Sequence, residues 1–248
     1  MQSPQRHSRA RRPRVSANLW VQKVEASLRS IANPDLAGPM NAYMKGIAPF
    51  LGIPKPKRAA AQKALGVPPL DDALDACRLL YALPEREFHY IATEILRKYG
   101  PQFEPDALEA VKWFVQTHSW WDTVDELTKC VGGIIRTHTF LESKLDEWVR
   151  DSDFWVQRAA ILHQLGFGTR TDVDRLVRLC LVQASNKEFF VRKAIGWALR
   201  DYAWTNPDAI RTFVNSHRSE FSPLTVREAL KNIDDPRAGT LKVKNAKG

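Results

Sequence analysis

The segment SWWDTVDELTKCV, residues 119–131, carries the pattern that decides the fold. Apolar residues recur in it at the three- and four-residue spacing of one helix face. These residues are Trp120, Val124, Leu127 and Val131. Ser119 followed by Asp122 is typical of a capped helix start. The segment therefore predicts an amphipathic helix that buries this stripe against other helices.

Trp121 and Asp125 fall outside the stripe and lie four residues apart, so they share a neighbouring face of the same helix. A large aromatic ring beside a carboxylate, away from the core stripe, is typical of a functional site. The alternative is that Trp121 packs against the next helix and that Asp125 is solvated or ion-paired. The helix by itself leaves both interpretations open.

No run of alternating polar and apolar residues predicts a strand, and caps and prolines divide the chain into helices instead. The expected ranges are 17–32, 39–48, 54–65, 70–83, 84–99, 104–117, 119–136, 139–149, 153–166, 170–184, 187–203, 207–217 and 223–233. Helix starts are marked by a proline or a capping box at Pro84-Glu85, Ser185 with Glu188, Asn206-Pro207 and Ser222-Pro223. Short helices with short connections predict an all-α fold.

A weak internal repeat refines this class. An aromatic residue followed four positions later by alanine occurs at Phe88/Ala92, Trp155/Ala159 and Phe190/Ala194. The copies start 67 and 35 residues apart, close to two units and one unit of about 34 residues. A middle copy is expected at Trp121, where Asp125 stands in place of the alanine. Helix pairs of this length build an α-α superhelix, a HEAT-like solenoid with a concave face.

Charge is concentrated at the two ends of the 248-residue chain. Of the net charge of +9, residues 1–15 contribute +5 and residues 241–248 contribute +3, so the remainder carries only +1. We expect one HEAT-like domain over residues 16–235, between a disordered basic tail at 1–15 and a second basic tail at 236–248. The arginine-rich tail is either a nucleic-acid-binding arm or a solubilising extension.

Several functional classes find no support. The three cysteines form no Cys-x-x-Cys pair, so neither disulfides nor a cysteine zinc site is expected, as in a reducing cytoplasm. The six histidines show no metal-ligand spacing, and the chain has no glycine-rich phosphate loop or Gly-x-Ser-x-Gly elbow. No apolar run approaches the ~20 residues of a membrane span, and the basic N-terminus lacks a signal peptide's apolar stretch. We expect no metal, no cofactor and no membrane contact, which leaves acid-assisted chemistry by one carboxylate among aromatic rings, or binding alone.

The helix expected at 187–203 combines aromatic rings with cations. Phe190, Lys193, Trp197 and Arg200 share one of its faces. This pattern is typical of a nucleic-acid groove, in which cations meet phosphates and rings meet sugars or bases. The alternative is that both rings pack on the adjacent helix while the two cations extend to solvent.

Arg158 stands inside the strongly apolar segment 154–162. A partly buried arginine requires an anionic partner. The candidates are a carboxylate, such as Asp125 or Asp151, and a bound phosphate.

Six segments between residues 20 and 233 follow the pattern of one protein family in order. They are PMNAYMK (39–45), FLGI (50–53), LPEREF (83–88), SWWDTVD (119–125), WVQRAAIL (155–162) and KEFFVRKAIGWALR (187–200). On these segments the chain resembles the AlkD-like DNA alkylation repair family, whose members are HEAT-like-repeat DNA glycosylases. Two departures from the family pattern, Pro54-Lys55 and Gly166, put individual DNA contacts in question.

The resemblance implies a superhelix that binds duplex DNA on its concave face and hydrolyses the N-glycosidic bond of cationic alkylated purines, N7-alkylguanine and N3-alkyladenine, in base excision repair. It implies that Asp125 is the catalytic carboxylate and that Trp121 and Trp197 flank the lesion nucleotide. Arg158 would contact the DNA backbone. The other residues expected to line the DNA groove are Tyr43, Phe190, Lys193 and Arg200.

No lysine stands at the position of the catalytic carboxylate, so we expect hydrolysis without lyase activity. The resemblance further implies a monomer without an obligate protein partner, acting at the bacterial nucleoid in the cytoplasm. Two alternatives from other classes are a catalytically silent DNA-binding scaffold and a HEAT-type protein-interaction module.

Overall fold

The computed structural model describes residues 15–239, in which it places thirteen α-helices, three short 3-10 helices and no strand. The α-helices are α1 (Val15–Ser30), α2 (Pro34–Tyr43), α3 (Lys55–Leu65), α4 (Leu70–Tyr81), α5 (Arg86–Tyr99), α6 (Ala107–Gln116), α7 (Trp121–Thr137), α8 (Glu142–Trp148), α9 (Phe154–Leu162), α10 (Val173–Val182), α11 (Phe189–Ala203), α12 (Pro207–Ser216) and α13 (Pro223–Leu230). The 3-10 helices are η1 (Gly100–Gln102), η2 (Thr139–Leu141) and η3 (Gly168–Arg170). The all-α prediction is confirmed. The predicted tail at 1–15, apart from its last residue, and residues 240–248 of the second tail lie outside the described residues.

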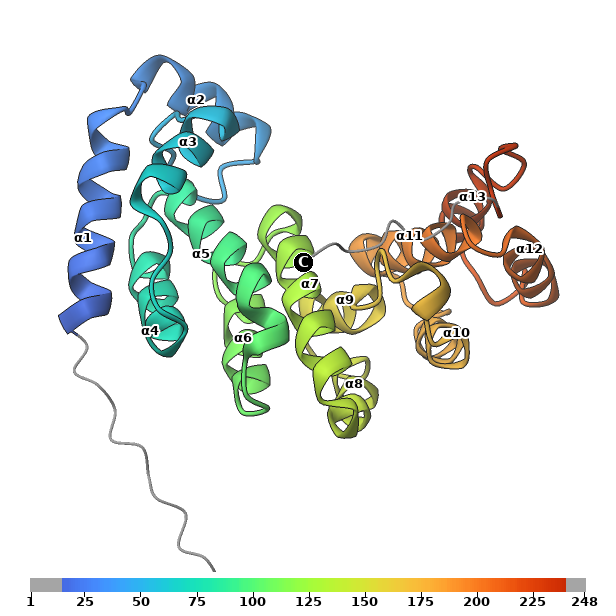
Figure 1. Ribbon diagram of the computed structural model, residues 1–248. Helices are drawn as coiled ribbons and strands as arrows, with labels where there is room; N and C mark the ends of the chain where they lie inside the picture. Colours follow the sequence, from blue (N-terminus) through green and yellow to red (C-terminus); the bar gives the residue numbers. More distant parts are fainter. Residues whose placement is uncertain (1–14, 240–248) are drawn as a thin grey trace, which may run out of the picture.

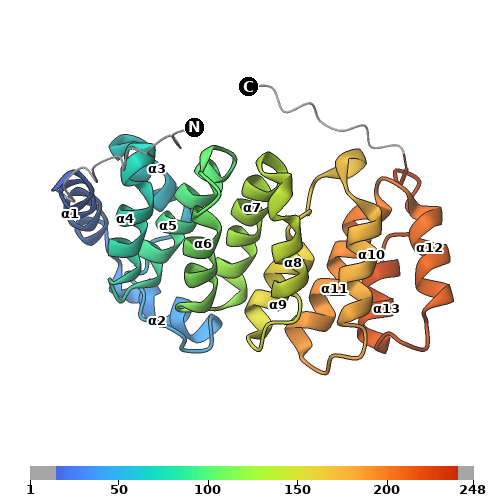
Figure 2. The same ribbon diagram turned by 90° about the horizontal axis from the view of Figure 1, so that it is seen from below.

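The helices form two layers that bend into an arc (Figures 1 and 2). An inner layer of α5, α7, α9, α11 and α13 packs side by side along the arc. An outer layer of α4, α6, α8, α10 and α12 covers its convex side, each helix against its inner partner. Helices α2 and α3 lie at the N-terminal end, beside α5. The predicted helical-repeat superhelix with a concave face is confirmed, and the inner layer brings successive repeats together on that face.

The middle repeat has a different register from the one predicted. The Trp120 ring lies 5.9 Å from that of Trp155, which in turn lies 4.7 Å from that of Phe190. Four residues after Trp120 stands Val124, which is fully buried. The middle copy is therefore Trp120/Val124, and Asp125 does not replace a small core residue. The alanine position of the repeat has to fit the next helix, which a carboxylate there would prevent.

The first turn of α7 is not held by the predicted capping box. The Ser119 hydroxyl donates to the Val115 carbonyl at 2.6 Å and so closes the preceding helix α6. Trp120 takes the cap position without a side-chain hydrogen bond. Asp122 instead engages the Arg86 guanidinium of α5. The predicted box is wrong because the Ser119 hydroxyl binds a carbonyl of the preceding helix and the Asp122 carboxylate binds Arg86 of α5.

Among the other predicted helix starts, one capping box is wrong and two caps are confirmed. Glu188 caps α11 by itself, accepting from the Phe190 amide at 3.3 Å, so the predicted box with Ser185 is wrong. The caps at Asn206 and Ser222, each followed by proline, are confirmed. α5 begins at Arg86, just after the predicted Pro84-Glu85 start.

The FLGI segment is a linker that ties the N-terminal helices to α5. The buried Glu87 carboxylate accepts from the Leu51 amide at 2.9 Å and from the Ile53 amide at 3.0 Å. Between them, Gly52 has a φ of 78°, and a Cβ there would lie 2.0 Å from the Asn33 carbonyl oxygen. Asn33 also caps α2, which starts earlier than the expected residue 39. This linker fixes α2 and α3 over the start of α5.

No helix between residues 15 and 239 is long and apolar enough to cross a membrane.

Candidate functional site

An ion pair between α7 and α9 forms the centre of the site on the inner face. Arg158 donates from Nε to Asp125 Oδ1 at 2.8 Å and from Nη2 to Oδ2 at 3.0 Å. Its third nitrogen, Nη1, donates to the Phe190 carbonyl of α11 at 2.7 Å. The fork of the guanidinium thus links three successive inner helices. The sequence left Asp125 and Asp151 as candidate carboxylate partners of Arg158. The partner is Asp125, because Asp151 pairs with Lys112 at 2.7 Å.

The Asp125 carboxylate is held at a boundary between protein and solvent. Its side chain is 17% exposed, against 5% for Arg158. Burial raises the pKa of Asp125, and the Arg158 guanidinium opposes that shift through hydrogen bonds and charge, while the charge of Asp122 adds to it. The Asp125 carboxyl group is therefore more basic than that of an exposed aspartate.

The two predicted tryptophans take different positions around this pair. The Trp197 ring lies 5.9 Å from the Arg158 guanidinium carbon, within cation–π range. Trp121, at the first position of α7, is 36% exposed and lines a neighbouring pocket. One ring thus lies on the arginine side of the pair, and the other lies in the wall of the pocket.

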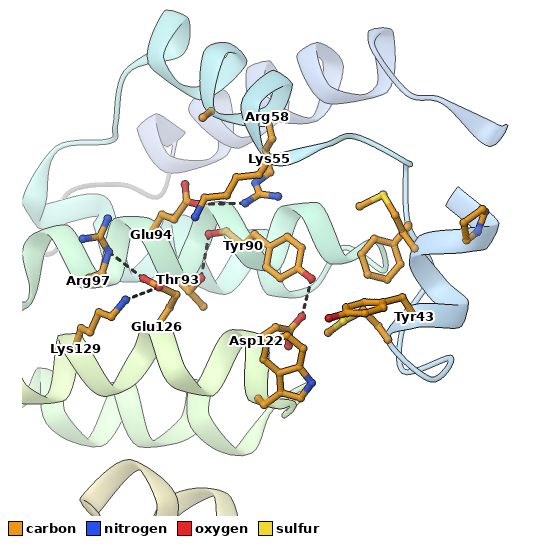
Figure 3. Close-up of a pocket in the computed structure, with 16 residues that line it drawn as sticks. Tyr43, Lys55, Arg58, Tyr90, Thr93, Glu94, Arg97, Asp122, Glu126 and Lys129 are labelled. Atoms are coloured by element: carbon orange, nitrogen blue, oxygen red, sulfur yellow. Dashed lines mark hydrogen bonds and ion pairs between the residues drawn. The ribbon is translucent and has the colours of Figure 1, made fainter. Parts of the chain in front are cut away.

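The pocket lies between α2 and α3 on one side and α5 and α7 on the other, with a volume of about 900 Å³ (Figure 3). Its aromatic and apolar walls include Tyr43, which is 73% exposed, with Phe50, Tyr90 and Trp121. Its polar lining comprises Lys55, Arg58, Thr93, Glu94, Arg97, Asp122, Glu126 and Lys129. Three of these cations are paired, Arg58 with Glu94 at 3.2 Å and both Arg97 and Lys129 with Glu126 at 3.0 and 2.6 Å. Tyr43 and Trp121, predicted as site residues from distant segments, share this pocket, whereas Asp125, Arg158 and Trp197 are not part of its lining.

The cations predicted on α11 share one acidic partner from α13. Lys193 Nζ lies 2.9 Å from Glu228 Oε1, and Arg200 Nη1 lies 2.6 Å from Oε2. These contacts lower the pKa of Glu228 and keep it ionised. The sequence analysis missed Glu228, because nothing local marks a residue that is brought in from the next repeat.

Phe190 occupies the packing position that the sequence left open as an alternative. Its ring packs against the rings of Trp155 and Trp120, with centroids 4.7 and 5.3 Å away. Its backbone carbonyl accepts a hydrogen bond from Arg158 Nη1. The ring therefore belongs to the aromatic stack between repeats.

A second buried ion pair, absent from the sequence analysis, lies one turn before Asp125. Arg86 donates from Nε to Asp122 Oδ2 at 3.1 Å, and the Tyr90 hydroxyl donates to the same oxygen at 2.6 Å. Figure 3 shows Tyr90 and Asp122 meeting inside the pocket. One signal was available: Arg86 and Tyr90 are four residues apart at a helix start, the same spacing as Trp121 and Asp125.

The two departures from the family pattern have structural explanations. Gly166 has a φ of 78° in the turn after α9, and its amide donates to Asp201 Oδ2 at 2.8 Å. Glycine suits this left-handed turn, in which a basic residue would be strained. Pro54 takes the cap position of α3, so Lys55 begins that helix and lines the pocket.

Within residues 15–239, no group of three histidine, cysteine or acidic side chains is arranged to hold a metal ion. All three cysteines are buried as free thiols.

These features define a helical-repeat protein whose concave face carries an ion-paired carboxylate among tryptophans. The sequence matches the family model for DNA alkylation repair enzymes over residues 24–233, and the chain belongs to this family. None of the curated protein sequences matches it. Among solved structures, a predicted DNA alkylation repair enzyme from Enterococcus faecalis is 30% identical, with a TM-score of 0.74 over 82% of this chain and 97% of that one. AlkD2 from Streptococcus mutans is 17% identical and has the same fold, with a TM-score of 0.60 over 88% of this chain and 100% of that one.

Proposed function

We propose that this protein is a monofunctional DNA glycosylase that hydrolyses the N-glycosidic bond of cationic alkylated purines in duplex DNA. The observation that carries the proposal is the Asp125 carboxylate on the concave face, which Arg158 binds in a bidentate contact. Trp121 belongs to the same helix as Asp125, and the Trp197 ring lies beside Arg158. Membership of the DNA alkylation repair enzyme family supports it.

The chemistry needs little beyond a fixed negative charge. A purine alkylated at N7 or N3 carries a positive charge and is already a good leaving group, so no acid has to protonate it. Its departure leaves a sugar with oxocarbenium character. A carboxylate beside that sugar stabilises the developing charge and orients or deprotonates the attacking water. Tryptophan faces favour a nearby cation, whether lesion or sugar.

The lysine nearest to the candidate carboxylate in the sequence is not arranged for strand cleavage. A lyase mechanism requires an uncharged amine that attacks the sugar. Lys129, one turn after Asp125, has its Nζ engaged in an ion pair with Glu126 at 2.6 Å. We therefore propose base release without a lyase step.

The groove offers cations for the phosphates of duplex DNA. Lys193 and Arg200 belong to the inner helix α11, and Lys55 begins α3 and lines the pocket. No ion pair involves Lys55 among the described residues. We propose that a single chain binds the duplex through these residues, without a protein partner. Since Arg158 occupies both oxygens of Asp125, a second candidate function is a DNA-binding scaffold that does not excise.

The deciding experiment is the release of free N7-methylguanine from methylated duplex DNA, read by chromatography, together with binding to the same duplex. Release without strand breakage supports the glycosylase. Binding without release supports the scaffold, and the absence of both contradicts the two proposals.

The N-terminal arginines allow a separate prediction. Deleting residues 1–15 should weaken binding to damaged and undamaged duplexes about equally, because an electrostatic arm contacts phosphates and not bases. Fluorescence anisotropy with matched duplexes measures both affinities. A loss confined to damaged DNA would contradict this role.

A further inference from the structure

We propose that Arg86, Asp122 and Tyr90 form a positioning network that holds the first turn of α7 in the geometry that excision requires. This inference rests on the proposed glycosylase function. None of the three residues was among the predicted site residues, and the network lies on the α5 side of α7, opposite to Arg158.

Arg86 is fully buried, and each of its three guanidinium nitrogens contacts the segment that leads into α7. Nε and Nη2 both donate to the Asp122 carboxylate, and Nη2 also donates to Thr123 Oγ1 at 3.0 Å. Nη1 donates to the His118 carbonyl at 2.6 Å. One side chain of α5 thus fixes both ends of the segment from residue 118 to residue 123.

This segment needs an external support because its own conformation is unfavourable. His118 has a φ of 50°, a left-handed conformation that costs a non-glycine residue about 1 kcal/mol or more. Trp120, at the cap position of α7, makes no side-chain capping bond. Arg86 supplies this support by donating to the His118 carbonyl and to the Asp122 carboxylate, so the direction in which α7 starts is set by α5.

Tyr90 connects the network to the open pocket. Its hydroxyl donates to Asp122 Oδ2 at 2.6 Å, and its ring lies 4.5 Å from the Arg58 guanidinium carbon. Burial and the charge of Asp122 raise the pKa of Tyr90, so the hydroxyl keeps its proton and remains a donor. Removing this single hydroxyl loosens Asp122 while the aromatic wall stays in place.

The network can affect the proposed reaction because α7 carries both Trp121 and Asp125. Trp121 is adjacent to Asp122, and Asp125 follows one turn later. Arg86 holds α7 from α5, while Arg158 holds it from α9, so the helix is fixed on two sides. A displacement of about 1 Å at a reacting group can cost about 10²-fold in rate. A loosened first turn should therefore reduce excision before it reduces DNA binding.

The test compares Tyr90→Phe with Tyr99→Phe as a matched control. Tyr99 also loses one hydrogen bond, from its hydroxyl to the Pro68 carbonyl at 2.7 Å, but it is not part of the network or of the pocket lining. Single-turnover excision of N7-methylguanine gives the rate constant of bound enzyme, and anisotropy gives the Kd for the same duplex. We expect Tyr90→Phe to lower the rate constant by about 3- to 10-fold with Kd changed less than about twofold, and Tyr99→Phe to change neither.

Asp122→Asn extends the series, and amide hydrogen exchange of residues 118–125 supplies a readout that does not depend on excision. We expect Asp122→Asn to lower the rate constant further, by about 10²-fold, and both network variants to accelerate exchange in this segment. Wild-type rate constants in Tyr90→Phe and in folded Asp122→Asn would overturn the proposal. So would equal exchange in wild type and Tyr90→Phe. A wild type that releases no base overturns the glycosylase proposal instead, and the exchange data then decide whether the network holds the turn.

Discussion

Replacing Asp125 with asparagine removes one negative charge from the concave face and almost no volume. Two unit charges about 4 Å apart interact by about 4 kcal/mol at the effective dielectric constant of about 20 typical of such sites. That energy corresponds to about a 10³-fold change in rate. Arg158 neutralises part of the charge, with both oxygens of Asp125 bound to its guanidinium. We therefore expect Asp125→Asn to lower the single-turnover excision rate by about 10²-fold or more.

The same substitution should leave the protein folded and able to bind DNA but less stable than wild type, because the buried Arg158 loses its anionic partner. The asparagine carbonyl oxygen can still accept from one Arg158 nitrogen, and Arg158 keeps its bond to the Phe190 carbonyl. The groove loses an anion, so affinity for undamaged duplex should stay equal or rise. The assay is release of N7-methylguanine under enzyme excess, with the melting temperature and the Kd measured on the same preparation.

Asp201→Asn is the matched control. Asp201 is also a largely buried carboxyl whose pKa is raised by burial, but it accepts from the Gly166 amide in the turn after α9. The Asp201→Asn protein should excise N7-methylguanine at the wild-type rate, even if its free energy of unfolding is lower. A folded, DNA-binding Asp125→Asn protein that excises within about threefold of wild type would refute the electrostatic role assigned to Asp125.

Three further predictions concern binding and stability. Glu228→Gln should free both α11 cations for phosphates, so duplex affinity should rise and the log–log salt slope should steepen by about 0.9 per added phosphate contact; an unchanged slope would contradict this. Burial lowers the pKa of His163 from 6.5 to about 4. Between these two pH values the unfolded chain binds a proton at His163 that the folded chain does not bind. The free energy of unfolding that this residue contributes above pH 6.5 is therefore lost as the pH falls towards 4. Denaturant unfolding across this range should show a loss approaching about 3 kcal/mol from this residue, and a flat profile would exclude it. Gly52→Ala should lower the unfolding free energy by about 2 kcal/mol or more, measured in urea, because its Cβ would lie 2.0 Å from the Asn33 carbonyl oxygen; a stability equal to wild type would show that the linker relaxes.

Helical periodicity was sufficient to predict the class of fold, but not the register between repeats. The stripe in residues 119–131 depends only on spacing along one helix, and its members Val124, Leu127 and Val131 are fully buried as expected. Whether Trp120 or Trp121 belongs to the repeat depends on which ring meets Trp155. That contact arises between helices, so the local pattern could not decide it.

The site shows the same boundary between local and tertiary information. The sequence could state that Arg158 requires an anion, because a buried guanidinium without one is unstable. It could not choose between Asp125 and Asp151, since that choice depends on Lys112 binding Asp151. The pairing of Arg86 with Asp122 was missed for a related reason. In the sequence, Asp122 near a helix start is readily interpreted as part of a cap. Only the packing of α5 on α7 shows that it pairs with Arg86 instead.

Two carboxylates one turn apart on α7 illustrate how environment separates structural from chemical roles. Asp122 accepts from two nitrogens of Arg86, from the Tyr90 hydroxyl and from the Thr123 amide, and its side chain is 8% exposed. A carboxylate with four donors has its lone pairs committed and cannot also orient a water. Among the described residues, the side-chain carboxylate of Asp125 accepts hydrogen bonds from Arg158 alone, one at each oxygen, which leaves acceptor capacity on both oxygens. The Asp122 carboxylate can therefore only hold the helix, whereas the Asp125 carboxylate keeps the acceptor capacity that the proposed reaction requires of it.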